Sequence, residues 1–257
     1  MLELRDISKV YSPGSVNENC LFRHFSLSIP KGQFVSVVGS NGSGKTSMLN
    51  MLCGSIPIDE GQILMGGEDI TKVKDFKRYQ RIGRVYQNPS AGTCGAMTLL
   101  ENMAMADHKG KRFGLSPGTQ KRRIDFYRGE LSRLELGLED KLQVPVSALS
   151  GGQRQALALV MSTLTPIEFL ILDEHTAALD PKTAEVIMRL TDRLVQEKKL
   201  TTLMVTHNLR YALEYGDRLL MLHEGQTVLD KTGEDKAALT LSDVLVLFNE
   251  ISIECGN

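Results

Sequence analysis

A glycine-rich segment of eight residues has the composition and spacing of a phosphate-binding loop. Residues 39–46 read Gly-Ser-Asn-Gly-Ser-Gly-Lys-Thr and fit the pattern G-x-x-x-x-G-K-[ST]. Glycines let the backbone curl so that successive N–H groups point at phosphate oxygens, and a helix that follows adds the partial positive charge of its N-terminus. We expect Lys45 to contact the β- and γ-phosphates of a nucleoside triphosphate and the Thr46 hydroxyl to bind Mg²⁺. The residues predicted to bind nucleotide in this loop and directly after it are Gly39, Ser40, Asn41, Gly42, Ser43, Gly44, Lys45, Thr46 and Ser47.

Two adjacent carboxylates, Asp173 and Glu174, follow a short apolar segment that ends at Leu172. In open α/β sheets, ligands bind where parallel strands end. We expect Asp173 to hold Mg²⁺ through water and Glu174 to act as the general base that polarises the attacking water. An exposed acidic turn is the alternative interpretation of this segment taken alone, and the phosphate-binding loop upstream disfavours it.

The elements that must position these residues form an α/β pattern. Three apolar segments, 34–38, 169–172 and 203–205, are typical of strands buried on both faces. Between the last two, Asp180 at an N-cap position, Pro181 at the first helical position and apolar residues at helical spacing predict a helix. A strand–helix–strand unit of this kind predicts parallel strands covered by helices.

Other segments complete the predicted architecture. Alternation of apolar and polar residues over 2–7 and 25–29 predicts antiparallel strands near the N-terminus. Residues 88–161 contain helical patterns at 99–106 and 124–136 without a convincing strand, which predicts a helical insertion in the α/β core. The remaining predicted elements are strands at 218–222 and 227–229 and an amphipathic helix at 239–248.

A further motif, Leu-Ser-Gly-Gly-Gln over residues 149–153, resembles the signature motif of ABC ATPases. The resemblance covers nearly the whole chain. It implies a P-loop NTPase: an α/β fold with a RecA-like parallel sheet core, an N-terminal antiparallel β subdomain and an inserted α-helical subdomain. The implied organisation is a single ABC ATPase domain over residues 1–257, with the helical subdomain at about 88–161 and a helix closing the domain at about 230–257.

The same resemblance implies roles for residues outside the phosphate-binding loop. Tyr11 matches the adenine-stacking aromatic, residues 178–180 match the D-loop, and Gln87 matches the Q-loop, where it would contact Mg²⁺ and water. His207 matches the switch histidine, which would contact the γ-phosphate and act with Glu174 in catalysis. Without the family pattern, Gln87 is more simply a solvated loop amide, and His207 and Tyr11 are more simply core side chains.

The signature motif implies an assembly of two chains. A helix is expected to begin at this motif, and its N-terminal amides form a potential anion site that faces no nucleotide within one chain. In the family, the signature of one chain closes over the γ-phosphate bound by another. This implies a head-to-tail homodimer with two ATP molecules at its interface. The residues implied to contact the partner's nucleotide are Ser150, Gly151, Gly152 and Gln153.

Composition limits the classes of function. The 257 residues include 30 Lys and Arg against 31 Asp and Glu, a net charge of −1, which argues against nucleic acid as a partner. No apolar run approaches the roughly 18–20 residues that span a bilayer, and the N-terminus has no signal-peptide pattern. We therefore expect separate membrane subunits to form any transport path. Four cysteines without a CxxC pair predict reduced thiols in an intracellular protein: Cys20, Cys53, Cys94 and Cys255.

The residue after Glu174 departs from the family pattern. Most ABC ATPases have proline there, whereas this chain has His175, for which we expect no chemical role. The sequence looks like a subgroup of bacterial ABC ATPases that work with a permease and an extracytoplasmic substrate-binding protein. This resemblance implies an importer ATPase at the cytoplasmic face of the membrane, with tryptophan or tyrosine as cargo. An exporter subunit, or a non-transport ATPase of assembly or repair, is the alternative.

The segment from Lys109 to Arg133 is strongly basic, with eight basic residues against two acidic ones. Contact with anionic lipid headgroups would be worth up to about 1 kcal/mol per charge near the surface. A solvated helix face with its loop is the simpler interpretation, and we favour it. The basic residues are Lys109, Lys111, Arg112, Lys121, Arg122, Arg123, Arg128 and Arg133.

Overall fold

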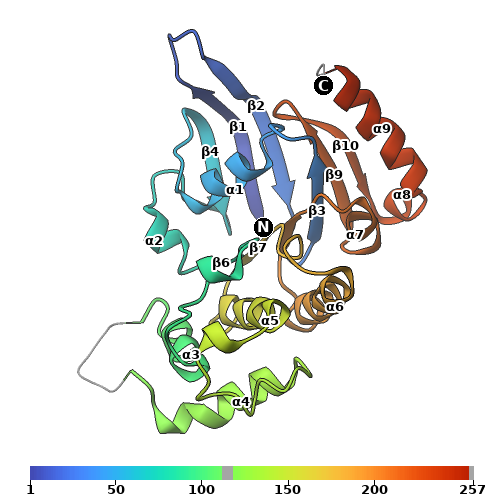
Figure 1. Ribbon diagram of the computed structural model, residues 1–257. Coiled ribbons are helices and arrows are strands. Elements are labelled where there is room, and N and C mark those ends of the chain that lie inside the picture. The colour runs from blue at the N-terminus through green and yellow to red at the C-terminus, as the bar shows by residue number, and fades with distance from the viewer. Residues whose placement is uncertain (112–117, 255–257) are drawn as a thin grey trace.

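The computed structural model describes residues 1–111 and 118–254 (Figure 1). Arg112 of the basic segment, Cys255 and the last residues of the predicted C-terminal segment lie outside the described residues. The strands of these described residues form two sheets. The first is antiparallel, with the order β2-β1-β4-β5, and is formed by β1 (Leu2–Tyr11), β2 (Asn19–Ile29), β4 (Glu60–Met65) and β5 (Glu68–Asp69).

The second sheet confirms the predicted α/β fold with a parallel core. Its order is β10-β9-β3-β8-β7-β6, and every neighbouring pair is parallel except β10 with β9. The strands are β3 (Phe34–Gly39), β6 (Ile82–Val85), β7 (Phe169–Asp173), β8 (Thr202–Val205), β9 (Arg218–His223) and β10 (Gln226–Thr232).

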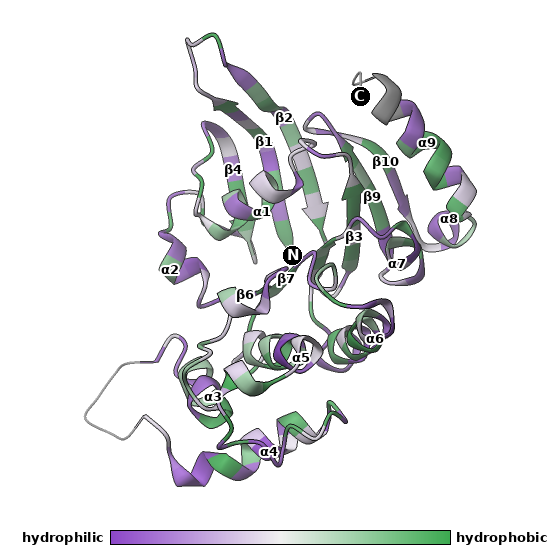
Figure 2. Ribbon diagram, viewed as in Figure 1, coloured by the Kyte–Doolittle hydropathy of each residue, from purple (hydrophilic) through white to green (hydrophobic). Residues whose placement is uncertain are grey.

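The central strands are apolar along their length because both faces of the sheet are covered, as their green colour in Figure 2 shows. In β7, Phe169 and Ile171 pack with α1 (Lys45–Cys53) and the first sheet, whereas Leu170 and Leu172 pack with the opposite layer of helices. The helix α1 therefore lies between the two sheets. The opposite layer includes α5 (Gly151–Ser162) and α6 (Pro181–Lys198).

The N-terminal strands are longer than the alternation pattern predicted. Strand β1 continues beyond Ile7, and β2 begins at Asn19 rather than near residue 25. The pairing of β1 with β2 shifts register at three places, and Asp6 and His24 have φ angles of 53° and 54°. Each bulge inverts the in–out order of side chains, so strict alternation breaks although the strand continues.

Between β6 and β7, the described residues form helices and no named strand, with only an isolated bridge between Thr98 and Pro145. Helices α3 (Leu99–Asp107), α4 (Ile124–Ser132) and α5 share a hydrophobic core of their own with part of α6, in the lower part of Figure 1. The prediction that α4 reaches residue 136 is wrong, because Glu135 adopts a left-handed φ of 57°. The division into residues 1–257, 88–161 and 230–257 stays a prediction.

Three strands of the described residues, β4, β5 and β6, have no counterpart among the predicted elements. In β4 only Ile63 and Met65 are buried, and β6 has four residues at the edge of the parallel sheet. Short helices lie in the connections: α2 (Asp75–Arg78) precedes β6, α7 (Leu209–Glu214) lies between β8 and β9, and α8 (Gly233–Ala237) follows β10. The predicted C-terminal helix is α9 (Leu241–Glu254). Within the described ranges, no helix is both long and apolar enough to cross a membrane.

Candidate functional site

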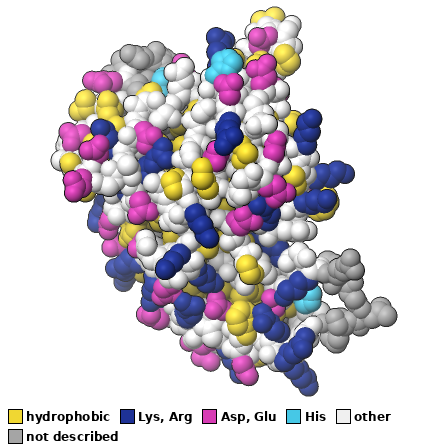
Figure 3. Space-filling model, turned by 180° about the vertical axis from the view of Figure 1, so that it is seen from behind, with side chains coloured by type: hydrophobic (Ala, Val, Ile, Leu, Met, Phe, Trp, Pro, Cys, Tyr) yellow, Lys and Arg dark blue, Asp and Glu magenta, His cyan; other side chains and the backbone are white. Residues whose placement is uncertain are grey.

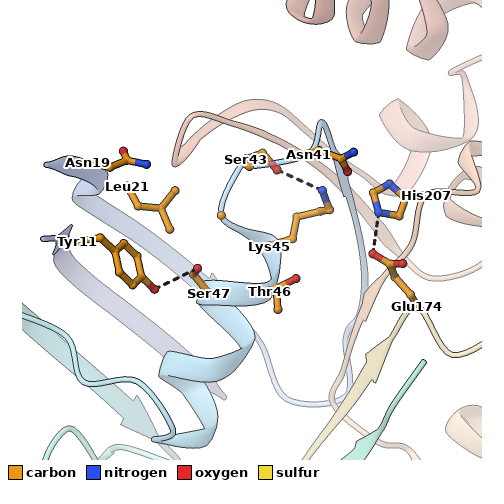
Figure 4. A pocket seen from close by; sticks show the side chains of 12 residues that line it. Tyr11, Asn19, Leu21, Asn41, Ser43, Lys45, Thr46, Ser47, Glu174 and His207 are labelled. Atoms are coloured by element: carbon orange, nitrogen blue, oxygen red, sulfur yellow. Dashed lines mark hydrogen bonds and ion pairs between the residues drawn. The ribbon is translucent and has the colours of Figure 1, made fainter. Parts of the chain in front are cut away.

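A pocket of about 320 Å³ lies between the phosphate-binding loop, the paired ends of β1 and β2, and the ends of β7 and β8 (Figure 4). Most of the residues predicted from the loop and the strand ends line it. They are Tyr11, Asn41, Gly42, Ser43, Gly44, Lys45, Thr46, Ser47, Glu174 and His207. Ser40 lines an adjoining hollow with His223 and Glu224.

The loop can pass close to its neighbours because two of its glycines lie where a side chain has no room. A Cβ on Gly39 would lie 2.1 Å from the carbonyl oxygen of Leu222, and a Cβ on Gly44 would lie 2.6 Å from Cζ of Phe22. Gly44 has a φ of 101° and is the N-cap of α1, without a side-chain cap. The first N–H groups of α1 are therefore available to a ligand in the pocket.

The side chain of Lys45 folds back over this loop. Its Nζ donates hydrogen bonds to the carbonyl oxygens of Gly39 and Ser40, at 2.7 and 2.8 Å, and to Oγ of Ser43 at 3.3 Å. Burial lowers the pKa of Lys45, and the carboxylate of Glu174 opposes part of that effect. The ammonium group is thus surrounded by oxygen acceptors of the kind that phosphate oxygens can replace.

The ends of β7 and β8 bring a carboxylate and an imidazole together. The two strands are adjacent and parallel, with Asp173 opposite Val205, so the residues that follow them meet at one edge of the sheet. Oε1 of Glu174 lies 2.7 Å from Nε2 of His207 (Figure 4). Glu174 has a left-handed φ of 47°, which is uncommon for a residue other than glycine and is found at functional sites.

The three predicted metal ligands come from three different elements. Thr46 lies in the first turn of α1, Asp173 ends β7, and Gln87 is exposed two residues beyond the end of β6. No group of three or more His, Cys, Asp or Glu in the described part of the chain could hold a metal by itself. A hydroxyl, a carboxylate and an amide suit Mg²⁺ that is bound together with nucleotide phosphates, because Mg²⁺ prefers few protein oxygens, phosphates and water.

Tyr11 lies at the opposite side of the pocket from Glu174. Its hydroxyl is 3.2 Å from Oγ of Ser47, and Nζ of Lys9 is 5.6 Å from its ring centroid. Asn19 and Leu21 of β2 line the same side and were missed by sequence reasoning. No local sequence pattern indicated them, because the register that pairs Asn19 with Tyr11 shifts at three places and is set by the folded hairpin.

The signature residues lie outside this pocket, at the N-terminus of α5. Ser150 is exposed and caps the helix: its Oγ accepts from the N–H of Gln153, whose side chain accepts from the N–H of Ser150. A Cβ on Gly152 would lie 2.3 Å from Cγ2 of Thr183, so this end of α5 packs tightly on the start of α6. The structure therefore does not bring the signature residues together with the pocket of the same chain.

His175 lies in the turn between β7 and α6, and its side chain contacts α6 rather than the pocket. Its side chain is buried, and its Nε2 lies 3.1 Å from Oγ1 of Thr191 on α6. The Thr191 hydroxyl donates to the carbonyl oxygen of Ile187, so Nε2 of His175 is the donor to Thr191. Burial lowers the pKa of His175 to about 4, which keeps the ring neutral.

Several charges of the basic segment are paired within the protein. Asp107 accepts from Lys111 and Arg123, Arg133 pairs with Glu130, and Lys109 donates to the carbonyl oxygen of Ile82. The lower part of Figure 3 nevertheless shows dark-blue Lys and Arg side chains at the surface of the helical region.

Comparison with known proteins identifies the family to which this pocket and its motifs belong. The sequence profile of the family described as ABC transporter matches residues 22–177, more than half of the chain. The chain belongs to the ABC transporter family. As an ABC ATP-binding cassette, it binds ATP and is an ATPase coupled to transport. Cassettes of this family work as dimers with membrane permease partners.

Individual relatives align with the cassette from end to end. The tyrosine transport ATP-binding protein of Clostridioides difficile is 45% identical over 248 residues, which is 96% of this chain and 98% of the relative. The phosphonates import ATP-binding protein PhnC of Lactobacillus johnsonii is 30% identical over 95% of both chains. The dimeric ATP-binding cassette MJ0796, bound to ADP and phosphate after hydrolysis, superposes with a TM-score of 0.76 at 28% identity. That superposition covers 90% of this chain and 98% of the solved one.

Proposed function

We propose that this chain is the ATP-hydrolysing subunit of a bacterial ABC importer for an aromatic amino acid, tyrosine or tryptophan. The observation that carries the proposal is the 45% identity, over nearly the full length of both chains, to a protein named as a tyrosine transport ATP-binding protein. Relatives named for import of phosphonates and of spermidine and putrescine support the import direction.

The pocket provides the groups that hold the nucleotide. In the proposal, the loop amides of residues 39–47 and the start of α1 bind the phosphates, and Lys45 exchanges its carbonyl partners for β- and γ-phosphate oxygens. Tyr11 stacks on the adenine, with Asn19 and Leu21 as neighbours in the wall. The anchored hydroxyl of Tyr11 supports this role, because it limits the rotation of the ring.

Hydrolysis in this proposal depends on the pair at the strand ends. Glu174 accepts a proton from the water that attacks the γ-phosphate. His207 donates a hydrogen bond to the Glu174 carboxylate and thereby orients it. The same imidazole contacts the γ-phosphate. The left-handed conformation of Glu174 supports this role, because a positioned base needs a fixed direction.

The proposed metal ligands are Thr46, Gln87 and Asp173, with Asp173 acting through water. Mg²⁺ bound with ATP would neutralise charge that develops on the transferred phosphoryl group. Gln87 is exposed, two residues beyond the end of β6, so it can approach or leave the nucleotide more easily than the other two. We therefore assign Gln87 the role of a sensor for bound nucleotide.

The active unit in this proposal is a head-to-tail homodimer. Ser150, Gly151, Gly152 and Gln153 of one chain contact the γ-phosphate bound by the loop of the other. Two observations support it: the signature residues lie outside their own pocket, and a dimeric cassette is a close structural relative. The homodimer would bind permease subunits at the cytoplasmic face of the membrane, with an extracytoplasmic substrate-binding protein delivering the cargo.

Uptake of labelled tyrosine and tryptophan, in a strain that lacks this chain, tests the proposal. We expect uptake of at least one of them to fall and to return when the wild-type chain is supplied. The Glu174→Gln variant, expressed at the same level, is the matched control and is expected to leave uptake low. Unchanged uptake of both amino acids in the deletion strain would contradict the proposed cargo. Increased retention of the labelled amino acid by the deletion strain would favour an exporter.

A further inference from the structure

Arg84 lies outside the pocket, yet its guanidinium contacts two elements that carry nucleotide-binding residues. It belongs to β6 and pairs in register with Ile171 of the neighbouring β7. Its Nη2 donates to Oδ2 of Asp173 at 2.6 Å, and its Nη1 donates to Oδ1 of Asn50, on α1, at 2.9 Å. The side chain of Arg84 is 7% exposed and that of Asp173 is 16% exposed. The ion pair is therefore largely shielded from water.

The same guanidinium contacts the segment that leads to Gln87. Cζ of Arg84 lies 4.8 Å from the ring centroid of Tyr86, which is a cation–π distance. The carbonyl oxygen of Tyr86 accepts a hydrogen bond of 3.0 Å from Nε2 of Gln155, a fully buried residue of α5. A continuous set of contacts thus runs from the signature helix, through Tyr86 and Arg84, to Asp173.

The geometry of this contact restricts the orientation of the Asp173 carboxylate. A guanidinium is planar and presents its donors in a rigid fork, unlike a lysine ammonium. Nε of Arg84 is buried and has no hydrogen-bond partner among the described residues. The hydrogen bonds of Nη1 and Nη2 therefore fix the orientation of the guanidinium.

We propose that Arg84 is a positioning residue for Asp173: it fixes the carboxylate that would hold Mg²⁺ and ties its orientation to the segment ending at Gln87. The inference rests on the proposed role of Asp173 in metal binding. The contact occupies Oδ2, and no hydrogen bond to Oδ1 is formed within residues 1–111 and 118–254. Oδ1 is therefore the oxygen left for a metal-bound water.

The positive charge of Arg84 also repels a divalent cation, which opposes the favourable effect of orienting Asp173. In the loaded site, the negative charges of the triphosphate and the acids Asp173 and Glu174 counter this repulsion. Loss of the guanidinium would also leave a buried carboxylate without its partner, free to turn toward other groups. We therefore expect loss of orientation to exceed relief of repulsion.

Mg²⁺ titration of ATP hydrolysis by the purified full chain tests the inference. At saturating ATP, Arg84→Gln is expected to raise the half-saturating Mg²⁺ concentration about tenfold, the usual cost of losing a residue that orients a metal ligand. ATP affinity measured in EDTA is expected to change by less than about twofold, because the phosphate-binding loop is untouched. Arg84→Lys keeps the charge without the fork and is expected to fall between the wild type and Arg84→Gln.

Two further variants separate this inference from the proposed function. Arg81→Gln removes a more exposed arginine–carboxylate pair, with Glu168, just before the same strand, and is expected to leave the Mg²⁺ dependence unchanged. Asp173→Asn is expected to raise the half-saturating Mg²⁺ concentration. If Asp173→Asn has no effect, the metal role of Asp173 is wrong, and so is the inference that depends on it.

If Asp173→Asn shifts the Mg²⁺ dependence and Arg84→Gln leaves it unchanged or lowers the half-saturating concentration, only the role of Arg84 is overturned. Should Arg84→Gln fail to fold, Arg84→Lys and Asn50→Ala decide by the same titration. A rise in either variant supports the positioning role, and no rise in both overturns it.

Discussion

Two glycine-rich helix N-termini of this cassette, at α1 and at α5, differ in what surrounds them. At α1, Gly44 provides no side-chain cap, and Lys45, Glu174 and His207 face the same pocket. At α5, the exposed Ser150 caps its own helix, and no residue of that motif lines the pocket. The first N-terminus faces a pocket built by its own chain, whereas the second has a similar anion-binding potential and lies outside that pocket. Similar local chemistry therefore serves two roles, and the tertiary surroundings separate them.

Among the variants that test this comparison, loss of the proposed base Glu174 is expected to have the largest effect, on the rate of hydrolysis. Glu174→Gln keeps size and hydrogen bonding but cannot accept a proton, so hydrolysis is expected to fall by about 10²–10⁴ while ATP binding remains. Bound ATP would then keep the two chains together, and gel filtration is expected to show a dimer with ATP and a monomer with ADP. Hydrolysis close to the wild-type rate would mean that another residue is the base. If the variant forms as much dimer with ADP as with ATP, the γ-phosphate is not what holds the interface together.

Disruption of the α5 N-terminus tests whether it acts on another chain. Ser150→Arg is expected to leave ATP affinity of the isolated chain unchanged and to lower hydrolysis by about 10²–10³, the cost of losing a donor to developing charge. A nucleotide-binding assay and a phosphate-release assay on one preparation separate the two effects. Normal hydrolysis by this variant would contradict the head-to-tail dimer.

Removal of the ammonium at the α1 N-terminus acts on the chain's own site. Lys45→Ala is expected to weaken ATP binding about 10–100-fold, because a charge-assisted contact to phosphate is lost. A mixture of the Lys45→Ala and Ser150→Arg variants gives a sharper test. In a head-to-tail dimer of the two, the intact loop of the Ser150→Arg chain faces the intact signature of the Lys45→Ala chain, so one site is complete. We expect hydrolysis to return in the mixture, and its complete absence would mean that each chain acts alone.

Buried His175, in the turn between β7 and α6, is expected to make the stability of the fold depend on pH. The pKa of His175 is lowered by burial from 6.5 to about 4, so the unfolded chain binds a proton more readily than the folded one. The stabilising contribution is present above pH 6.5 and is lost as the pH falls toward 4, by about 1.5 kcal/mol between pH 6.5 and 5. Urea unfolding is expected to show a weaker loss over this interval in His175→Gln, whereas the exposed-site control His24→Gln behaves like the wild type.

The smallest expected effect concerns the wall formed by β1 and β2. Tyr11→Ala is expected to weaken ATP binding about fivefold, near the lower end for loss of an aromatic that stacks on a base. Tyr11→Phe, which keeps the ring and loses the contact to Ser47, is the matched control and is expected to bind nearly as well as the wild type. Equal affinity in all three proteins would assign Tyr11 to the core instead.

The prediction of the fold succeeded where burial is uniform and failed where the backbone is irregular. Apolar segments such as 34–38 and 169–172 indicated buried parallel strands, because covering both faces of a sheet requires apolar side chains throughout. Bulges near Asp6 and His24 hid the length of β1 and β2, and the left-handed Glu135 ended α4 early. These local turns depend on packing with partners distant in the sequence, which no local pattern records.

For the site, the sequence by itself determined the groups: a glycine loop with Lys45 and Thr46, two acids after a strand, and a second glycine motif at residues 149–153. Their types and spacing carry that information because phosphate binding needs a curled backbone and a cation. Only the tertiary structure decided which of them share a pocket. It also revealed Asn19, Leu21 and Arg84, since the register of paired strands and the side chains that a buried carboxylate contacts are set by the folded chain as a whole.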